Sequence, residues 1–154
     1  MKKIIYTAIF GEYDNLPDPL FKPKGWDFVC FTDSNIKSNI WNIEKVPAIY
    51  EDPTRNARKY KVLPHRWFPD YEYSLWLDGN IKVRDDVNEL LGHLDGCNYA
   101  TYDHLQNPLD PRGCIYDEGS TILQLGIKNG GNYKDNPDLI KRQMERYVKE
   151  GYPK

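Results

Sequence analysis

Three residues in the middle of the chain combine side chains that can hold a divalent cation. Asp78, Gly79 and Asn80 interrupt an apolar, aromatic stretch that runs from Tyr73 to Val83. A tight turn would bring the Asp78 carboxylate and the Asn80 amide oxygen to the same side, and hard cations prefer oxygen ligands. We therefore predict that Asp78 and Asn80 hold a Mn²⁺ or Mg²⁺ ion, with a diphosphate completing its shell. Asp-Gly between apolar residues is equally typical of a hairpin turn.

A predicted basic helix precedes this stretch. Asp52 followed by Pro53 is typical of a helix start, and the helix is expected to run to about Leu63. At about 100° per residue, its basic side chains gather on one arc. Arg58 and Lys61 lie one turn apart on it and are suited to binding phosphate oxygens. The alternative interpretation is a basic face that only water contacts.

The elements that would position these residues alternate between strands and helices. Apolar runs typical of strands span Ile4 to Phe10, Asp27 to Thr32, Trp41 to Val46, Tyr73 to Leu77 and, more briefly, Asn98 to Tyr102. This alternation predicts an α/β fold, a Rossmann-like three-layer sandwich with a mainly parallel central sheet, over residues 1–154 as a single domain. Ligands of such sheets bind beyond the carboxyl ends of the strands, where the polar residues lie.

Two further helices are expected from their capping residues. Asp86 begins a capping-box pattern, and Asn136-Pro137 marks a second start. The first helix would turn Val87, Leu90, Leu91 and Leu94 inward, and the second Ile140, Met144, Tyr147 and Val148. Between them, a loop is expected from His104 to about Gly119.

Asp103 and His104 follow the short expected strand and form a second candidate for chemistry. Histidine is the usual proton-transfer residue near neutral pH, so this pair is a candidate for an acceptor-side base. An exposed loop histidine is the alternative. Arg112, Asp117 and Glu118, in the polar loop that follows, either face an acceptor or are simply solvated.

The composition limits the class of partner. A net charge of −2 argues against nucleic acid. No segment approaches the roughly 18 apolar residues of a membrane span. The three cysteines lie far apart without a Cys-x-x-Cys pair, which indicates free thiols in a cytoplasmic setting rather than a zinc site.

Several segments resemble a glycosyltransferase-like family that was long catalogued only as a domain of unknown function. They are YTAIFGEYDNLPDP, FVCFTD, RNARKYKVLPHRWFPDYEYSLWLDGNI and QMERYVKEGYP. The family includes plant Golgi proteins linked to mucilage polysaccharides and bacterial proteins found among cell-surface polysaccharide functions. The resemblance implies a GT-A-type fold, a nucleotide-sugar donor such as a UDP-sugar, a glycan acceptor, and a divalent cation held by an Asp-x-Asp-like motif.

The resemblance also implies roles for individual residues. Asp78 takes the first acidic position of the motif and Asn80 the last, where aspartate is usual; Asp78 would act in catalysis through the cation. The segment matching the base- and ribose-binding part contains Phe10, Gly11, Tyr13 and Asp14, with Asp33 at the end of the second strand. Arg58 and Lys61 match the basic segment before the motif.

The length of the chain keeps a different class of function open. Comparable members continue beyond the last residues, whereas this chain ends at Lys154, so it is either a short or a truncated member. A non-catalytic nucleotide- or carbohydrate-binding module with the same fold is therefore the alternative. A nucleotidyltransferase is disfavoured, because the loop from Gly11 to Asp14 has one glycine and no cation.

Overall fold

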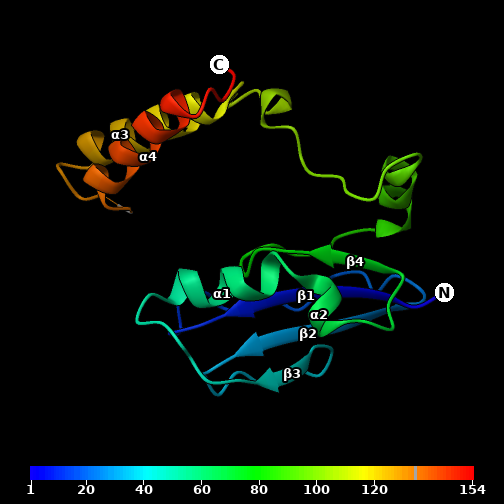
Figure 1. Ribbon diagram of the computed structural model, residues 1–154. Coiled ribbons are helices and arrows are strands. Elements are labelled where there is room, and N and C mark those ends of the chain that lie inside the picture. The colour runs from blue at the N-terminus through cyan, green and yellow to red at the C-terminus, as the bar shows by residue number, and fades with distance from the viewer. Residues whose placement is uncertain (134) are drawn as a thin grey trace. The chain divides into compact units, whose positions relative to one another are not determined.

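Four parallel strands form one sheet in the first part of the chain. They are β1 (Lys3–Ile9), β2 (Trp26–Thr32), β3 (Asn42–Lys45) and β4 (Tyr73–Trp76), in the order β3-β2-β1-β4 (Figure 1). The order places β1 and β2, which are the two longest strands, in the middle of the sheet. The expectation of a parallel sheet is confirmed.

The structure is a computed structural model that describes residues 1–133 and 135–154. The chain divides into two compact units, residues 1–97 and 98–154. The sheet belongs to the first unit, and the second unit is helical. The expectation of a single domain over residues 1–154 stays a prediction. In the described part of the chain, no helix combines the length and the apolar character that crossing a bilayer requires.

Both faces of β1 are buried, because its side chains alternate between two apolar clusters. Tyr6 and Ala8 belong to the cluster that contains Phe31 of β2, whereas Ile5 and Ile9 belong to the cluster that contains Cys30. A strand that is covered on both faces reads as a continuous apolar run, as in parallel sheets. This explains why the sequence of β1 lacks the polar alternation of a half-exposed strand.

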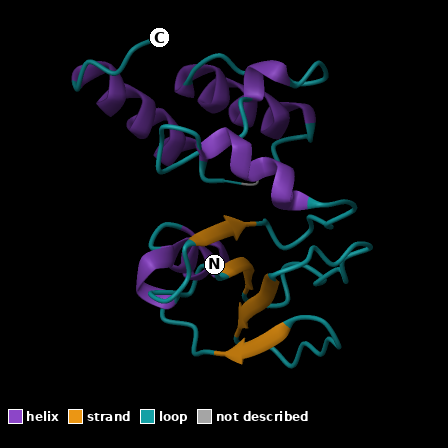
Figure 2. Cartoon of the chain, turned by 90° about the vertical axis from the view of Figure 1, so that its right-hand side faces the viewer, coloured by secondary structure: helices purple, strands orange, loops and turns teal. Residues whose placement is uncertain are grey.

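Two helices cover the Tyr6 face of the sheet (Figure 2). They are α1 (Pro53–Lys61) and α2 (Pro64–Trp67). The predicted start of α1 is confirmed, since Asp52 accepts a hydrogen bond from the Thr54 N–H at 2.8 Å. Tyr60 of α1 stacks on Phe31 with ring centroids 4.3 Å apart, which fixes the helix against β2.

The opposite face is covered by the 3₁₀ helix η1 (Val87–Leu94), which shows the expected Asp86 cap. Val87 and Leu91 pack against the cluster that contains Ile5 and Cys30, whereas Leu90, expected to point inward, is 46% exposed. The expected three layers, with helical segments on both faces of the sheet, are thus confirmed.

The second unit contains the 3₁₀ turn η2 (His104–Gln106) and the helices α3 (Ile115–Lys128) and α4 (Pro137–Lys149), which lie side by side (Figure 1). The start of α4 is confirmed, because Asn136 accepts a hydrogen bond from the Asp138 N–H at 3.0 Å. Three expectations are wrong. Residues 98–102 form no strand, α3 begins inside the expected loop, and Val148 is 59% exposed.

Candidate functional site

The candidate site lies where the order of the strands reverses. The chain passes from β1 outward to β2 and β3, then returns to place β4 on the other side of β1. The Leu77 N–H donates to the Tyr6 carbonyl at 3.0 Å, so the pairing of β1 with β4 continues to the last residue before Asp78. Ligands of doubly wound sheets bind beyond the carboxyl ends of strands at such a reversal. The loops after β1 and β4 are therefore the segments to consider first.

The Asp-Gly-Asn segment after β4 forms a turn. The Ile81 N–H donates to the Asp78 carbonyl at 2.9 Å, so the expectation of a tight turn is confirmed. No hairpin follows it, because the sheet of the described residues is parallel throughout. Gly79 is buried. Its φ lies outside the left-handed region, so the backbone conformation does not require glycine at this position. A Cβ there would lie 2.8 Å from Ile9 Cγ1 and 3.0 Å from Asp14 Oδ2, so the glycine is required for space.

Two donors from different elements meet at one oxygen of Asp78. The indole Nε1 of Trp76 donates to Asp78 Oδ1 at 2.7 Å, and the ammonium of Lys61 lies 3.1 Å from the same oxygen. The side chains of Lys61 and Asp78 are 45% and 64% exposed. The carboxylate is thus oriented at the surface and accessible to ligands from solvent.

Buried aromatic packing fixes the backbone around these donors. The Tyr6 hydroxyl donates to the Lys61 carbonyl at 3.1 Å, and the Tyr6 ring meets the Trp76 ring edge-on at 5.2 Å between centroids. The Lys61 ammonium lies 5.4 Å from the centroid of the Trp76 ring. Tyr6 is 2% exposed, so the end of α1 and the end of β4 are held to the core through one side chain.

The loop after β1 is tied to the end of β2. The Gly11 N–H donates to Asp33 Oδ1 at 3.0 Å, which brings together two residues that were both predicted to bind the nucleotide. Gly11 and Glu12 have φ values of 61° and 55°. A Cβ on Gly11 would also lie 2.9 Å from Pro53 Cγ, so the loop packs closely against the start of α1.

The other predicted residues of this loop differ in what they can offer a ligand. Phe10 is 2% exposed and stacks on Tyr60 at 5.8 Å, so only its main chain is available. Tyr13 is 57% exposed. The half-buried Asp14 places its carboxylate against Gly79, next to the predicted metal residues.

The oxygen donors at this turn fit a hard cation. Asp78 and Asn80 are both exposed, and the Asp14 carboxylate lies beside the glycine between them. Mg²⁺ is commonly bound by one or two carboxylates, with waters and phosphate oxygens filling the other positions. Within residues 1–133 and 135–154 there is no group of three or more His, Cys, Asp or Glu side chains that is able to hold a metal. A cation here would therefore depend on oxygens from its ligand.

Of the two predicted phosphate-binding residues, only Lys61 contacts the turn. Arg58 is exposed one helical turn earlier, and its guanidinium forms no ion pair with any described residue. The two cations flank the same end of α1. Their role in phosphate binding stays a prediction.

Asp103 and His104 belong to the second unit and are both exposed there. Asp103 caps η2, since its Oδ1 accepts a hydrogen bond from the Leu105 N–H at 3.0 Å. The His104 ring meets the Tyr102 ring edge-on at 5.6 Å. Asp103 therefore stabilises the start of η2, in addition to its predicted catalytic role.

Arg112 joins two carboxylates of the second unit, Asp110 and Glu118. The Arg112 side chain is 15% exposed, and hydrogen bonds to both carboxylates raise its pKa. The bond to Arg112 in turn lowers the pKa of Asp110. Arg112, which was predicted either to face an acceptor or to be solvated, is thus paired with two carboxylates of its own unit.

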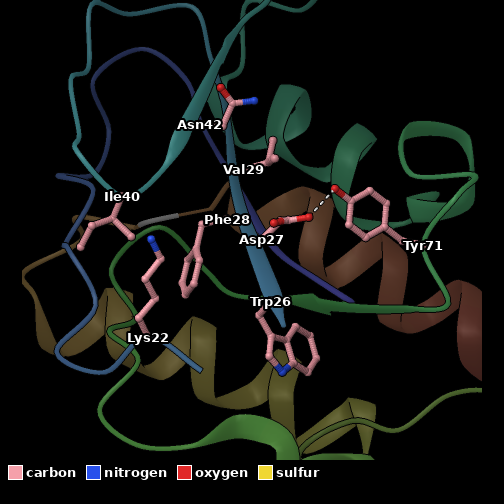
Figure 3. A pocket seen from close by; sticks show the side chains of 8 residues that line it. All are labelled: Lys22, Trp26, Asp27, Phe28, Val29, Ile40, Asn42 and Tyr71. Carbon is pink, nitrogen blue, oxygen red and sulfur yellow. Dashed lines mark hydrogen bonds between the residues drawn. The ribbon is translucent and has the colours of Figure 1, made fainter. Parts of the chain in front are cut away.

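A hollow of about 310 Å³ lies elsewhere, beside the amino-terminal half of β2 (Figure 3). Tyr71, on its rim, donates a hydrogen bond to Asp27 at 2.8 Å, which raises the pKa of the tyrosine. None of the residues that line it was predicted to bind a ligand. The hollow is lined by Lys22, Trp26, Asp27, Phe28, Val29, Ile40, Asn42 and Tyr71. The hollow lies away from the carboxyl ends of the strands, where ligands of such sheets bind.

Comparison with known proteins gives one family. Residues 27–154 match the model of the TOD1/MUCI70 glycosyltransferase-like domain. This range contains the Asp78 turn but not the loop after β1. No solved structure gives a significant match to the chain.

Two plant relatives match parts of the chain. One, from Arabidopsis thaliana, is named probable hexosyltransferase MUCI70 and is 30% identical over 107 residues, which are 57% of this chain and 18% of the relative. Another from the same plant, named alkaline ceramidase TOD1, is 25% identical over 108 residues, which are 54% of this chain and 23% of the relative. The chain thus spans about a fifth of the length of these relatives.

Proposed function

Because the chain belongs to the TOD1/MUCI70 glycosyltransferase-like domain family, we propose that it transfers a sugar from a nucleotide-sugar donor to a hydroxyl group of an acceptor. The name of the hexosyltransferase relative supports this reaction type. A UDP-sugar is the proposed donor and a glycan the proposed acceptor, in the synthesis of cell-surface polysaccharide. The exposed thiol of Cys97 suits a reducing, cytoplasmic compartment.

One observation carries the proposal. The Asp78 carboxylate stands at the carboxyl end of β4, beside the strand-order reversal, with the cation Lys61 at 3.1 Å. A carboxylate and a cation next to each other suit a ligand that brings both a divalent ion and phosphate groups. Ligands of doubly wound sheets generally bind at this edge, which supports the proposal.

We assign the donor side of the reaction to the first unit. Asp78 and Asn80 hold the Mn²⁺ or Mg²⁺ ion through their side-chain oxygens, and Lys61 or Arg58 binds the diphosphate. The ion, when bound, supplies Lewis-acid stabilisation of the charge that develops on the leaving nucleoside diphosphate. The main chain at Gly11, oriented by Asp33, contacts the nucleoside.

We assign the acceptor side to Asp103 and His104. A neutral imidazole can accept the proton of an attacking hydroxyl, and His104 is exposed and accessible for this. Asp103, which caps η2, holds the start of that turn in place. The two residues are therefore the first to replace when transfer, rather than donor binding, is measured.

The test of the donor site is a thermal-shift experiment with Mn²⁺, UDP, and both together. We expect UDP to raise the melting temperature only when Mn²⁺ is present, and the Asp78→Asn variant to lose this effect. Asp95→Asn is the matched control, because Asp95 is an exposed carboxylate of the same unit. If Asp78→Asn binds UDP with unchanged affinity and metal dependence, the assignment of Asp78 is wrong.

Activity assays separate the remaining alternatives. Hydrolysis of a UDP-sugar, or transfer from it to a glycan, supports the transferase and excludes a module that only binds. Because one relative is named a ceramidase, the same preparations are tested for release of fatty acid from ceramide. Ceramide cleavage without UDP binding would contradict the proposal.

A further inference from the structure

The Asp78 carboxylate has a cationic side chain beside it, that of Lys61. Its Oδ1 accepts one hydrogen bond from Trp76 at 2.7 Å and lies 3.1 Å from the Lys61 ammonium. The two donors differ in charge and in the conformational freedom of their side chains. Trp76 is the last residue of β4 and carries a neutral N–H, whereas Lys61 is the last residue of α1 and ends in a flexible, half-exposed chain.

A divalent ion and the Lys61 ammonium compete for this carboxylate. An ion such as Mg²⁺ lies about 2 Å from the oxygen that binds it, which would bring it close to an ammonium at its present position. Two positive charges at such a separation repel each other strongly. The Trp76 N–H carries no charge and can keep its hydrogen bond when the ion arrives.

Lys61 can leave the carboxylate without disturbing the fold. The Tyr6 hydroxyl binds the Lys61 carbonyl, which is a main-chain atom, so the end of α1 stays in place when the side chain turns. The side chain has four rotatable methylene groups and lies at the surface. A phosphate group bound to the same ion would offer the displaced ammonium a new partner of opposite charge.

We infer that Lys61 is the resident counter-ion of Asp78 and changes partners during donor binding. In the ligand-free protein Lys61 occupies the cation position at Asp78, and it moves to the diphosphate when the divalent ion takes that position. Trp76 orients the carboxylate in both states. This inference rests on the proposed function, because it needs a cation at Asp78. It makes the binding of ion and nucleotide cooperative, since each ligand favours the same move of one side chain.

The test is the Lys61→Met variant, which keeps the length of the side chain and removes its charge. With Mn²⁺ alone, measured by calorimetry, we expect Lys61→Met to bind about two- to fivefold more tightly than the wild type, because an exposed competing ion pair is lost. With UDP in saturating Mn²⁺, we expect about tenfold weaker binding, because a charge-assisted hydrogen bond to phosphate is lost. A purely structural role of Lys61 would not change the two affinities in opposite directions.

Lys59→Met is the matched control. Lys59 is on the same helix and has the same charge, but its ammonium lies over the Tyr60 and Trp67 rings, at 5.5 and 5.4 Å from their centroids. We expect its replacement to leave both affinities within about twofold of the wild type, since it does not contact Asp78.

The outcomes distinguish the inference from the proposed function. If Asp78→Asn abolishes Mn²⁺ binding but Lys61→Met leaves it unchanged or weakens it, the exchange is refuted and the metal site stands. If neither the wild type nor Lys61→Met binds Mn²⁺, either alone or together with UDP, the metal site and the exchange are both refuted. Tighter Mn²⁺ binding with weaker UDP binding in Lys61→Met, and in it alone, supports the exchange.

Discussion

The two units of the chain are stabilised by different kinds of packing. In the first unit, a parallel sheet is covered on both faces, and every fully buried apolar side chain of the described residues lies at or before Val83. In the second unit, the described residues that are fully buried are Gly119 and Gly126. The first unit is thus stabilised by a core, and the second by the close approach of two helices.

This difference indicates which of the candidate site residues are held in place by a buried core. Asp78 is anchored through Trp76 and Tyr6 to a buried sheet. Asp103 and His104 stand on a single 3₁₀ turn at the surface. We therefore expect changes in the first unit to alter stability strongly, and changes in the second to be local.

The largest effect is expected from Phe31→Ala. Phe31 is 7% exposed and its ring stacks on Tyr60 at 4.3 Å, so its removal leaves a cavity between β2 and α1. We expect the free energy of unfolding to fall by about 3–5 kcal/mol, measured by urea unfolding followed by circular dichroism. Leu125→Ala in the second unit, where Leu125 is 48% exposed, should change it by less than about 1 kcal/mol. Equal effects of the two variants would show that the contrast between the units is false.

A smaller loss of stability is expected from Asn56→Ala, which removes a buried polar side chain rather than an apolar one. The Asn56 side chain is buried, accepts hydrogen bonds from the N–H groups of Ile49 and Tyr50, and donates to the carbonyls of Tyr50 and Asp52. Its removal leaves these groups without their partner and should lower the unfolding free energy by about 2–3 kcal/mol. An equal loss in Asn42→Ala, a change at an exposed asparagine in the same unit, would contradict this explanation.

The helix contact of the second unit is tested with a pair of glycine variants. A Cβ on Gly126 would lie 2.0 Å from the rigid Tyr133 ring, whereas one on Gly119 would lie 2.6 Å from the sulfur of the flexible Met144. We expect Gly126→Ala to destabilise the helix pair by about 1–3 kcal/mol, and Gly119→Ala by less, because the thioether can turn aside. Thermal unfolding of the helices by circular dichroism measures both. A larger effect at Gly119 would mean that the ring contact does not hold the pair together.

The smallest effect concerns two cysteines of the first unit, Cys30 and Cys97. Burial raises the pKa of the Cys30 thiol from 9.0 to about 12, so the native protein should react with a thiol reagent at Cys97, which is exposed, and not at Cys30. Because the unfolded chain loses this proton near pH 9 and the folded one near pH 12, the contribution of Cys30 to stability should decrease as the pH rises through that range. Mass spectrometry after labelling measures the first effect, and alkaline unfolding of Cys30→Ala isolates the second. Labelling of native Cys30 at pH 8 would contradict its burial.

The sequence predicted the first unit better than the second, for physical reasons. The runs in β1 and β2 are apolar on both faces, and Asp52-Pro53 is an unambiguous helix start, so local chemistry and tertiary packing agree there. The failures at residues 98–102 and at α3 occur where no buried core supports the local pattern. Tyr99, for example, is of a residue type that is common in strands, but it is 78% exposed.

Two glycines obscure the helix α3 in the sequence. Gly119 and Gly126 normally weaken a helix, yet here each leaves room for a side chain, Met144 or Tyr133. Sequence spacing cannot reveal a contact between residues that become neighbours only after the chain has folded. For the same reason, the candidate site was predicted as separate segments, and the bond between Gly11 and Asp33 and the pairing of Lys61 with Asp78 came from the structure.

The space that Asp14 and Ile9 take above Gly79 has a consequence for the engineering of this protein. A side chain at position 79 collides with position 14, so the two positions should show epistasis rather than independent effects. Libraries that vary the turn alone would recover glycine almost every time. Libraries that vary residues 9 and 14 together with residue 79 would open new sequences at the turn.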